Sequence, residues 1–361
     1  MPVRVDVLIP AYNAASTLCA AVESIRAQSV RDIRVVIVDD GSTDETPALL
    51  GAMAHEDERI QVVTKSNGGI VEALNEGLGH CSAEFIARFD SDDISFPDRF
   101  ERQLAYLAAH PECVAVGGAV GHMDEHGAPL AGLPQPGPPS DADPAKAPAL
   151  EPYIIHPFLM VRRAAVTAVG GYRYVPNSED SDLFWRLAEQ GTLINLPDVL
   201  GKYRVHTASI SSSIVSGRVM AVGSQLGALS ALRRRGGRAD IDFSRDLPAA
   251  LKRAGTLEAM TGVAGSLLER SERDHLRIAV ATKLMELARY RPFEPDAGDC
   301  AFIRAALPHA RRLTRQNQKE IDWYVTVTAA RLIRKGKWAE ALTLTPPTSL
   351  PTAAARVLLS R

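Results

Sequence analysis

Short apolar runs alternate with amphipathic segments of helical period over the first 215 residues. Strands are predicted at residues 3–9, 33–38, 60–64, 85–89, 114–120, 154–161, 193–195 and 200–205. Helices are predicted between them, one ending near Ala27 and the others over residues 46–54, 70–78, 97–109 and 183–189. Alternation of strand and helix is typical of a mainly parallel, doubly wound α/β sheet.

The pattern changes from residue 216, where strand signals nearly vanish and Ala, Leu and Arg recur at helical spacing. We therefore predict two domains, an α/β domain over residues 1–215 and a smaller all-α domain over residues 216–361. The second is expected to hold helices at 218–235, 256–270, 273–289, 299–315, 318–335 and 337–344.

Three carboxylates follow the strand at 85–89 within four positions, at Asp90, Asp92 and Asp93. Like charges this close repel one another unless a cation lies among them, and Mg²⁺ or Mn²⁺ binds oxygen ligands of this kind. The alternative is a solvated acidic turn, or Asp residues that cap the next helix. Tyr12, Asp39 and Asp40 also follow strands, and parallel strands bring their carboxyl ends to one crevice.

Composition is that of a globular protein, with 46% hydrophobic and 23% charged residues among 361 and no stretch that would span a bilayer. The four cysteines have neither metal-type nor redox-type spacing, which indicates a reduced, cytoplasmic protein.

The net charge of −2 conceals an asymmetry. Residues 1–215 carry 16 Lys and Arg against 29 Asp and Glu, which gives −13, and residues 216–361 carry 25 against 14, which gives +11. A basic half, with clusters at residues 233–235 and 311–312, suggests an anionic partner such as a membrane surface or the chain's own acidic half. The alternative is solvated helix faces or a homodimer, and nucleic acid is not among the partners we expect.

Several motifs occur together in one order along the chain: Ile9-Pro10-Ala11-Tyr12-Asn13, Val38-Asp39-Asp40-Gly41-Ser42-Thr43-Asp44, Asn67-Gly68-Gly69, Arg88-Phe89-Asp90-Ser91-Asp92-Asp93, Gly170-Gly171-Tyr172, Glu179-Asp180-Ser181-Asp182-Leu183 and Tyr203-Arg204-Val205-His206. Over about residues 3–213 this set resembles the inverting glycosyltransferases of family 2, of the bacterial polysaccharide type. The resemblance implies a GT-A fold with a doubly wound mixed sheet. One departure is Glu72, near which relatives commonly have a basic residue.

The resemblance implies that a sugar is moved from a nucleoside-diphosphate sugar, with UDP favoured, to an acceptor hydroxyl. It makes Asp92 the direct ligand of Mn²⁺ or Mg²⁺, places Asp90 nearer the ribose and gives Asp93 a supporting role. The donor would also contact Pro10, Ala11, Tyr12, Asp39, Asp40 and Asn67. The alternatives are a core aromatic at Tyr12 and simple turn chemistry at the two Asp residues.

The same resemblance places the base for the acceptor hydroxyl at Asp180, supported by Glu179. A carboxylate in the first turn of a helix is favoured by the helix dipole. The alternative is a capping box in which Asn177 is the cap and Asp180 the third helical residue. His206 could complete the metal site with Asp92, because imidazole suits Mn²⁺, or it could be structural.

Relatives of this kind build bacterial surface polysaccharides on sugar or lipid-linked glycan acceptors. We therefore expect an enzyme at the inner face of the cell membrane, held peripherally by its basic half. One alternative is a nucleotidyltransferase, which would need a Gly-rich basic loop after the first strand. Another is a non-catalytic nucleotide-sugar-binding scaffold, which would be expected to lack one of the carboxylates present here.

Overall fold

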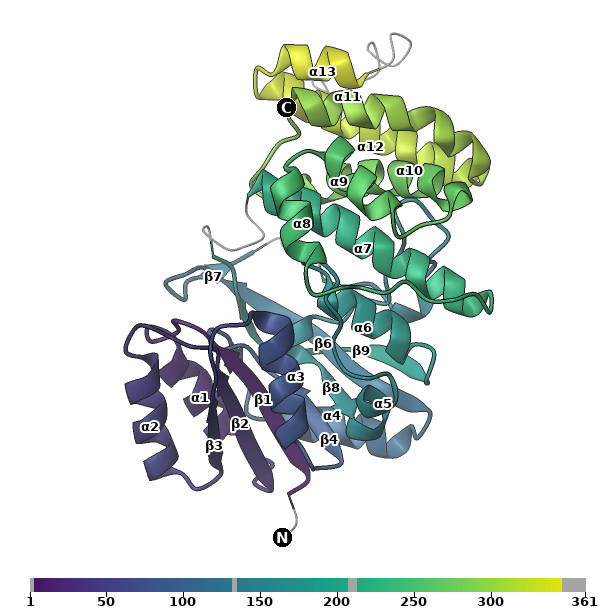
Figure 1. Ribbon diagram of the computed structural model, residues 1–361. Coiled ribbons are helices and arrows are strands. Elements are labelled where there is room, and N and C mark those ends of the chain that lie inside the picture. The colour runs from purple at the N-terminus through teal and green to yellow at the C-terminus, as the bar shows by residue number, and fades with distance from the viewer. Residues whose placement is uncertain (1–2, 132–134, 207–212, 346–361) are drawn as a thin grey trace. The chain divides into compact units, whose positions relative to one another are not determined.

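The computed structural model describes residues 3–131, 135–206 and 213–345. These divide into two compact units (Figure 1). Of the described residues, the first unit comprises 3–131, 135–141, 152–173 and 183–206, and the second comprises 142–151, 174–182 and 213–345. The predicted boundary at 215 falls inside a helix, Ile214–Arg235 (α7), and no single boundary anticipates the two short segments that join the helical unit.

The first unit is built on a mixed sheet. Its strands are Val5–Ala11 (β1), Ile33–Asp39 (β2), Ile60–Thr64 (β3), Phe85–Arg88 (β4), Ile94–Ser95 (β5), Cys113–Met123 (β6), Pro129–Leu130 (β7), Met160–Arg162 (β8) and Thr192–Arg204 (β9). The order is β3-β2-β1-β4-β8-β6-β9-β5, and β7 pairs with β6. Strands β1 to β4 are mutually parallel, whereas β8 runs antiparallel to both β4 and β6. The predicted doubly wound, mixed sheet is therefore confirmed.

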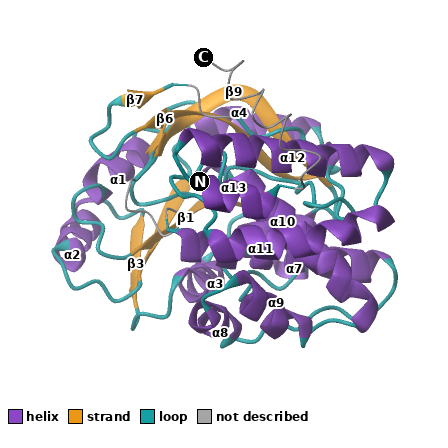
Figure 2. Ribbon diagram, turned by 90° about the horizontal axis from the view of Figure 1, so that it is seen from above, coloured by secondary structure: helices purple, strands orange, loops and turns teal. Residues whose placement is uncertain are grey.

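Helices cover both faces of this sheet (Figure 2). On one face, alternate residues of β1 such as Val5, Val7 and Ile9 share a hydrophobic core with apolar residues of three helices. These are Leu18–Arg26 (α1), Thr46–Glu56 (α2) and Arg99–Ala109 (α4). On the other face, Ile70–His80 (α3) packs against β1 and β2. The helix Arg163–Ala168 (α5) adjoins β8.

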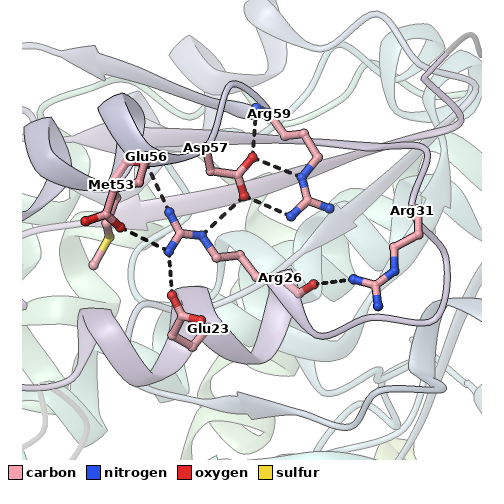
Figure 3. Close-up of polar contacts among 7 residues, drawn as sticks. All are labelled: Glu23, Arg26, Arg31, Met53, Glu56, Asp57 and Arg59. Carbon is pink, nitrogen blue, oxygen red and sulfur yellow. Dashed lines mark hydrogen bonds and ion pairs between the residues drawn. The ribbon is translucent and has the colours of Figure 1, made fainter.

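A polar network joins the ends of α1 and α2 (Figure 3). Arg26 lies 3.2 Å from the carboxylate of Asp57 and donates to the backbone oxygen of Met53. Arg59 binds the same carboxylate through two nitrogens, at 3.0 and 2.8 Å. The hydrogen bond from Arg59 lowers the pKa of Asp57 to about 2. The network ties the end of α1 to the end of α2 and to the residues that precede β3.

Two predicted strand segments differ in the structure. Residues 154–161 do not form one strand, because His156–Phe158 is a 3₁₀ helix and only Met160–Arg162 pairs in the sheet. Pro157 has no N–H to donate to a ladder, which explains the break. Residues 193–195 and 200–205 instead belong to one continuous strand, β9. The sequence patterns also did not predict the short strands β5 and β7 or helix α5.

The second unit is helical. It contains α7, Leu247–Ala254 (α8), Leu257–Gly265 (α9), Arg270–Leu287 (α10), Ala297–Ala306 (α11), Arg315–Arg334 (α12) and Trp338–Leu344 (α13), and a 3₁₀ helix at Leu307–Arg312. Another 3₁₀ helix, Pro139–Asp141, lies in the first unit. The sequence patterns missed α8. The hydrophobic core of the second unit also includes Ala147 and Val175, which come from the short segments 142–151 and 174–182. Among the described residues, no helix is both long enough and apolar enough to cross a bilayer.

The helix Glu179–Leu187 (α6) is divided between the two units. Its first turn, Glu179 to Asp182, groups with the helical unit, and the rest groups with the sheet unit. Phe184 and Trp185, in that later part, are fully buried.

Candidate functional site

The sheet has a topological switch point between β1 and β4. From β1 the chain proceeds outward through β2 to β3, and β4 returns on the other side of β1. Ligands in open α/β sheets bind at the carboxyl ends of the strands at such a point. Tyr12 follows the last residue of β1, Asp39 ends β2 and Asp90 follows β4 closely. The predicted donor and metal residues therefore occupy one edge of one sheet.

Asp90, Asp92 and Asp93 form a compact acidic cluster. One carboxylate oxygen from each lies within 4.8 Å of those of the other two. Asp93 is 1% exposed, and its Oδ2 is buried without a hydrogen-bond partner among the described residues. Burial and the charges of Asp90 and Asp92 raise the pKa of Asp93 well above its usual range. An unsatisfied buried oxygen beside two further carboxylates fits a hard divalent cation, which prefers oxygen ligands.

The end of β9 closes over this cluster. His206 Nε2 lies 2.7 Å from Asp92 Oδ2, so the structure brings together the two residues predicted as metal ligands. Arg204 donates its backbone N–H to Asp93 Oδ1 at 2.7 Å and its Nε to the backbone oxygen of Asp92 at 2.7 Å. Burial raises the pKa of Asp92, Asp90 raises it further, and the contact with His206 lowers it.

Arg88 is a site residue that sequence reasoning missed. It is the last residue of β4, is 5% exposed, and lies 2.6 Å from Asp90 Oδ1. Its Nε and Nη1 are buried without hydrogen-bond partners among the described residues. The sequence did contain a signal for Arg88: it is a basic residue at the end of an apolar strand, two positions before the acidic cluster. The ion pair holds the Asp90 carboxylate at the strand end.

Two loops at this edge are joined by hydrogen bonds. Thr43 donates its backbone N–H to Asn13 Oδ1 at 2.8 Å, and Asn13 donates its own to Ser42 Oγ at 2.9 Å. Tyr12, between Ala11 and Asn13, is 52% exposed. The alternative of a core aromatic at Tyr12 is therefore excluded, and the ring of Tyr12 is accessible to a planar ligand. Pro10 and Ala11 lie buried in β1 beneath it.

Asp39 and Asp40 differ in their surroundings. Asp39 Oδ1 accepts a hydrogen bond from the Ser42 N–H at 3.0 Å. Asp40 is fully engaged, since its carboxylate accepts from Lys65 Nζ at 2.7 Å and from the backbone N–H groups of Gly68 and Gly69 at 3.0 and 2.8 Å. Asp40 thus ties the end of β2 to the loop before α3.

Asn67 takes part in the same clamp. Its side-chain amide donates to the backbone oxygen of Asp40 at 3.0 Å. Lys65 also lies 3.6 Å from Glu72, so the departure from the family pattern at Glu72 places a second carboxylate beside this lysine. The geometry of Asp40 and Asn67 supports the turn interpretation more than a direct contact with the donor.

The Gly170-Gly171-Tyr172 motif has a structural role. Asn75 on α3 forms two hydrogen bonds with the backbone of Tyr172, accepting from its N–H at 2.8 Å and donating to its oxygen at 2.9 Å. The Tyr172 hydroxyl lies 2.7 Å from His156 Nε2. Burial lowers the pKa of His156 well below its usual range. The motif docks the segment before α6 onto α3.

Glu179 and Asp180 lie in the first turn of α6, in the part that groups with the helical unit. The acidic cluster belongs to the sheet unit. The helix begins at Glu179, so Asp180 is its second residue. The alternative of a capping box, with Asn177 as cap and Asp180 as the third helical residue, does not fit these bounds. Asn177 has φ 51°, in the left-handed region, and forms part of the turn before the helix. Asp180 Oδ1 accepts from the Ser181 N–H at 2.7 Å.

Comparison with known proteins decides the family. The profile described as Glycosyl transferase family 2 matches residues 6–170. The protein named glycosyltransferase EpsE of Bacillus subtilis is 34% identical over 211 residues, which cover 56% of this chain and 73% of EpsE. The chain belongs to glycosyltransferase family 2. This family 2 glycosyltransferase is also 35% identical over 204 residues to the amylovoran biosynthesis glycosyltransferase AmsE of Erwinia amylovora, covering 55% of this chain and 75% of AmsE.

Solved structures confirm the GT-A fold. The mannosyltransferase PcManGT of Pyrobaculum calidifontis, in complex with GDP-Man and Mn²⁺, matches 100% of this glycosyltransferase and 88% of its own chain, with a TM-score of 0.53 and 19% identity. S. aureus TarS 1–349 in complex with UDP-GlcNAc matches 92% of each chain, with a TM-score of 0.51 and 17% identity. These likenesses concern the fold.

Proposed function

We propose that this glycosyltransferase moves a sugar from a nucleoside-diphosphate sugar, with UDP favoured, to an acceptor hydroxyl, with inversion at the anomeric carbon. The observation that carries the proposal is the cluster of Asp90, Asp92 and Asp93 at the switch point, joined by His206. A second support is that the fold neighbours PcManGT and TarS are described in complex with nucleotide sugars. All carboxylates that a non-catalytic scaffold would be expected to lose are present.

We propose that Asp92 and His206 hold Mn²⁺ or Mg²⁺, with Asp90 on the ribose side and Asp93 beneath them. When bound, the cation would stabilise the negative charge that develops on the leaving diphosphate. The chain's own residues orient the site: Arg88 fixes Asp90, and Arg204 fixes Asp93 and the backbone of Asp92. In this proposal Tyr12 stacks on the base, Asp39 accepts a hydrogen bond from it, and Pro10 and Ala11 form the floor.

We propose Asp180 as the base that accepts the proton of the acceptor hydroxyl, with Glu179 in support. A single displacement with one base inverts the anomeric configuration. NMR of the product should show the anomer opposite to that of the donor. Retention would contradict the role of Asp180.

The experiment that tests the function measures nucleoside-diphosphate release from a panel of nucleotide sugars with an acceptor glycan. Turnover is expected with Mn²⁺ or Mg²⁺, to stop in EDTA and to recover when the metal is restored. Asp180→Asn should lose nearly all turnover yet still bind nucleotide, whereas Asp92→Ala should lose metal-dependent binding. Release of pyrophosphate from a nucleoside triphosphate and a sugar phosphate would instead indicate a nucleotidyltransferase. Full turnover in chelator would contradict the metal assignment.

We further propose that the product belongs to a bacterial surface polysaccharide, built on a sugar or lipid-linked glycan acceptor at the cytoplasmic face of the membrane. The support is the relation to AmsE, which is named for amylovoran biosynthesis. Extracts of a strain lacking this chain should accumulate an acceptor that the purified enzyme glycosylates.

A further inference from the structure

The segment 174–182, which carries Asp180, is held closely by the helical unit. A side chain at Gly223 of α7 would place its first carbon 1.9 Å from the backbone oxygen of Pro176, so glycine is required at this contact. Ser178 Oγ donates to the Asn177 oxygen at 2.7 Å and lies 3.4 Å from that of Met220. The backbone before the proposed base is therefore packed directly on α7.

A second segment of the same unit, residues 142–151, is also anchored at several points. Asp143 and Leu150 exchange backbone hydrogen bonds at 2.8 and 3.0 Å. Asn317 of α12 makes two hydrogen bonds to the backbone of Ala147, both at 2.9 Å. Ala149 donates to Gln225 of α7 at 2.9 Å. These contacts fix the position of Glu151 at the end of the segment.

Glu151 connects α10 to the first turn of α6. Lys283 of α10 places its Nζ 2.8 Å from Glu151 Oε1 and 3.1 Å from Glu286 Oε2. The other oxygen of Glu151 accepts a short hydrogen bond from the hydroxyl of Ser181, the residue after Asp180. Lys283 and Ser181 are 9% and 3% exposed. Burial lowers the pKa of Lys283, but Glu151 and Glu286 outweigh it and raise the pKa well above its usual value, so the ammonium stays charged.

We propose that Lys283, Glu151 and Ser181 are positioning residues, which fix the first turn of α6 so that Asp180 meets the acceptor hydroxyl. The inference rests on the proposed role of Asp180. It assigns a task to the helical unit: to hold the base in place. Rates fall by roughly 10²-fold when a reacting group is misplaced by about 1 Å, so this network should influence turnover more than donor binding.

The chain offers matched controls. Arg233 of α7 and Glu272 of α10 form another buried ion pair, at 2.6 Å, in the same unit. Ser230 of α7 is a buried serine whose hydroxyl donates to the carboxylate of Asp240. Neither pair includes a residue of 142–151 or 174–182. Removing one partner of any buried pair is destabilising, so Arg233→Met and Ser230→Ala reproduce the general cost to folding.

The test compares Lys283→Met and Ser181→Ala with Arg233→Met and Ser230→Ala. Hydrogen–deuterium exchange of the amides at 177–184 is measured first, because it does not depend on activity. Exchange there should be faster in Lys283→Met and Ser181→Ala and unchanged in the two controls. Glu151→Gln combined with Lys283→Met removes the charges of both Glu151 and Lys283 and leaves only Glu286 without its contact to the lysine. This double variant is the test variant if Lys283→Met alone does not fold.

Kinetics supply the second readout. With saturating acceptor, kcat should fall about 10- to 100-fold in Lys283→Met and Ser181→Ala, with the donor KM within about twofold of the wild type. The two control variants should lose as much thermal stability as Lys283→Met and Ser181→Ala but keep the wild-type kcat. Unchanged exchange at 177–184, or faster exchange with an unchanged kcat, would overturn the inference. Full turnover of Asp180→Asn would instead overturn the base assignment, and it is measured separately.

Discussion

Asp39 and Asp40 are neighbours in sequence with different surroundings. Asp40 is bound by Lys65 and two backbone N–H groups, whereas Asp39 accepts one N–H from Ser42. Asp40→Asn should lower the melting temperature by several degrees, because it removes the ion pair with Lys65 and replaces a charged acceptor of two backbone N–H groups with a weaker, neutral one. Asp39→Asn should weaken nucleotide binding about 10-fold with a smaller change in melting temperature. Thermal unfolding of both variants measures stability, and calorimetric titration measures nucleotide affinity. Equal losses of nucleotide affinity in the two variants would contradict a structural role for Asp40 and a binding role for Asp39.

His206 gives a second prediction at this scale. Because its Nε2 lies 2.7 Å from Asp92, His206→Ala should weaken Mn²⁺ binding by at least about 10-fold, as loss of one ligand does. His156→Ala is the matched control, since His156 is buried against Tyr172. It should lower stability and leave the metal affinity of the folded protein unchanged. Manganese titration followed by electron paramagnetic resonance measures both, and equal Mn²⁺ affinity of His206→Ala and wild type would exclude His206 as a ligand.

Much of the site could be predicted because its parts are local in sequence. Asp90, Asp92 and Asp93 follow one apolar strand, and the strand pattern alone carries them to a sheet edge. Contacts between distant segments could not be predicted from pattern: Asp40 with Lys65, and Glu151 with Lys283, depend on the tertiary fold.

At the scale of elements, the turn before α6 depends on two glycines with φ of 76° and 71°. A side chain at Gly171 would meet Asn75 Oδ1 at 2.6 Å, whereas one at Gly170 would meet nothing within 4 Å. Gly170→Ala should therefore cost about 1 kcal/mol from backbone strain alone, and Gly171→Ala distinctly more. Urea unfolding of the two variants measures the difference, and equal losses would show that the contact between α3 and this turn is not needed.

The network between α1 and α2 predicts a dependence of stability on pH. The folded pKa of Asp57 is about 2, below its ordinary value near 3.8. A carboxyl whose pKa is lowered by folding adds stability above its unfolded pKa and loses it as pH falls through the folded pKa. The stability difference between wild type and Asp57→Asn should therefore shrink as pH falls from about 4 to about 2. Urea unfolding at several pH values checks this, and a constant difference would contradict it.

Strands buried in the parallel part of the sheet were predicted closely, because their apolar runs end in turn residues. The prediction for β3, residues 60–64, matches the structure. The interpretation of 154–161 was wrong because an apolar run around His156-Pro157 is compatible with a buried 3₁₀ turn. Periodicity alone does not separate the two.

At the scale of the whole molecule, fewer basic side chains of residues 216–361 are available to bind an anionic partner than the net charge of this half indicates. Arg233 is buried against Glu272, Arg234 lies 2.9 Å from Asp240, and Arg312 lies 2.7 Å from Asp274. An anionic membrane would be contacted by the exposed arginines of this half, among them Arg235, Arg311 and Arg312.

We therefore expect modest, salt-sensitive binding to liposomes that contain anionic lipid. Basic residues near such a surface contribute about 1 kcal/mol each. Arg235→Ser combined with Arg311→Ser should lower co-sedimentation at low salt, whereas Arg233→Ser should lower stability instead. No binding of the full chain to anionic liposomes would favour another partner for this half.

We propose that the acidic cluster at the switch point is a metal-assisted nucleotide-sugar site. Calorimetric titration with UDP, GDP, CDP and dTDP tests it most directly, in Mn²⁺ and in EDTA, on wild type and Asp92→Ala. One of these nucleotides should bind the wild type in Mn²⁺, and this binding should be lost in EDTA and in Asp92→Ala. Equal affinity in EDTA, or in Asp92→Ala with Mn²⁺, would contradict it.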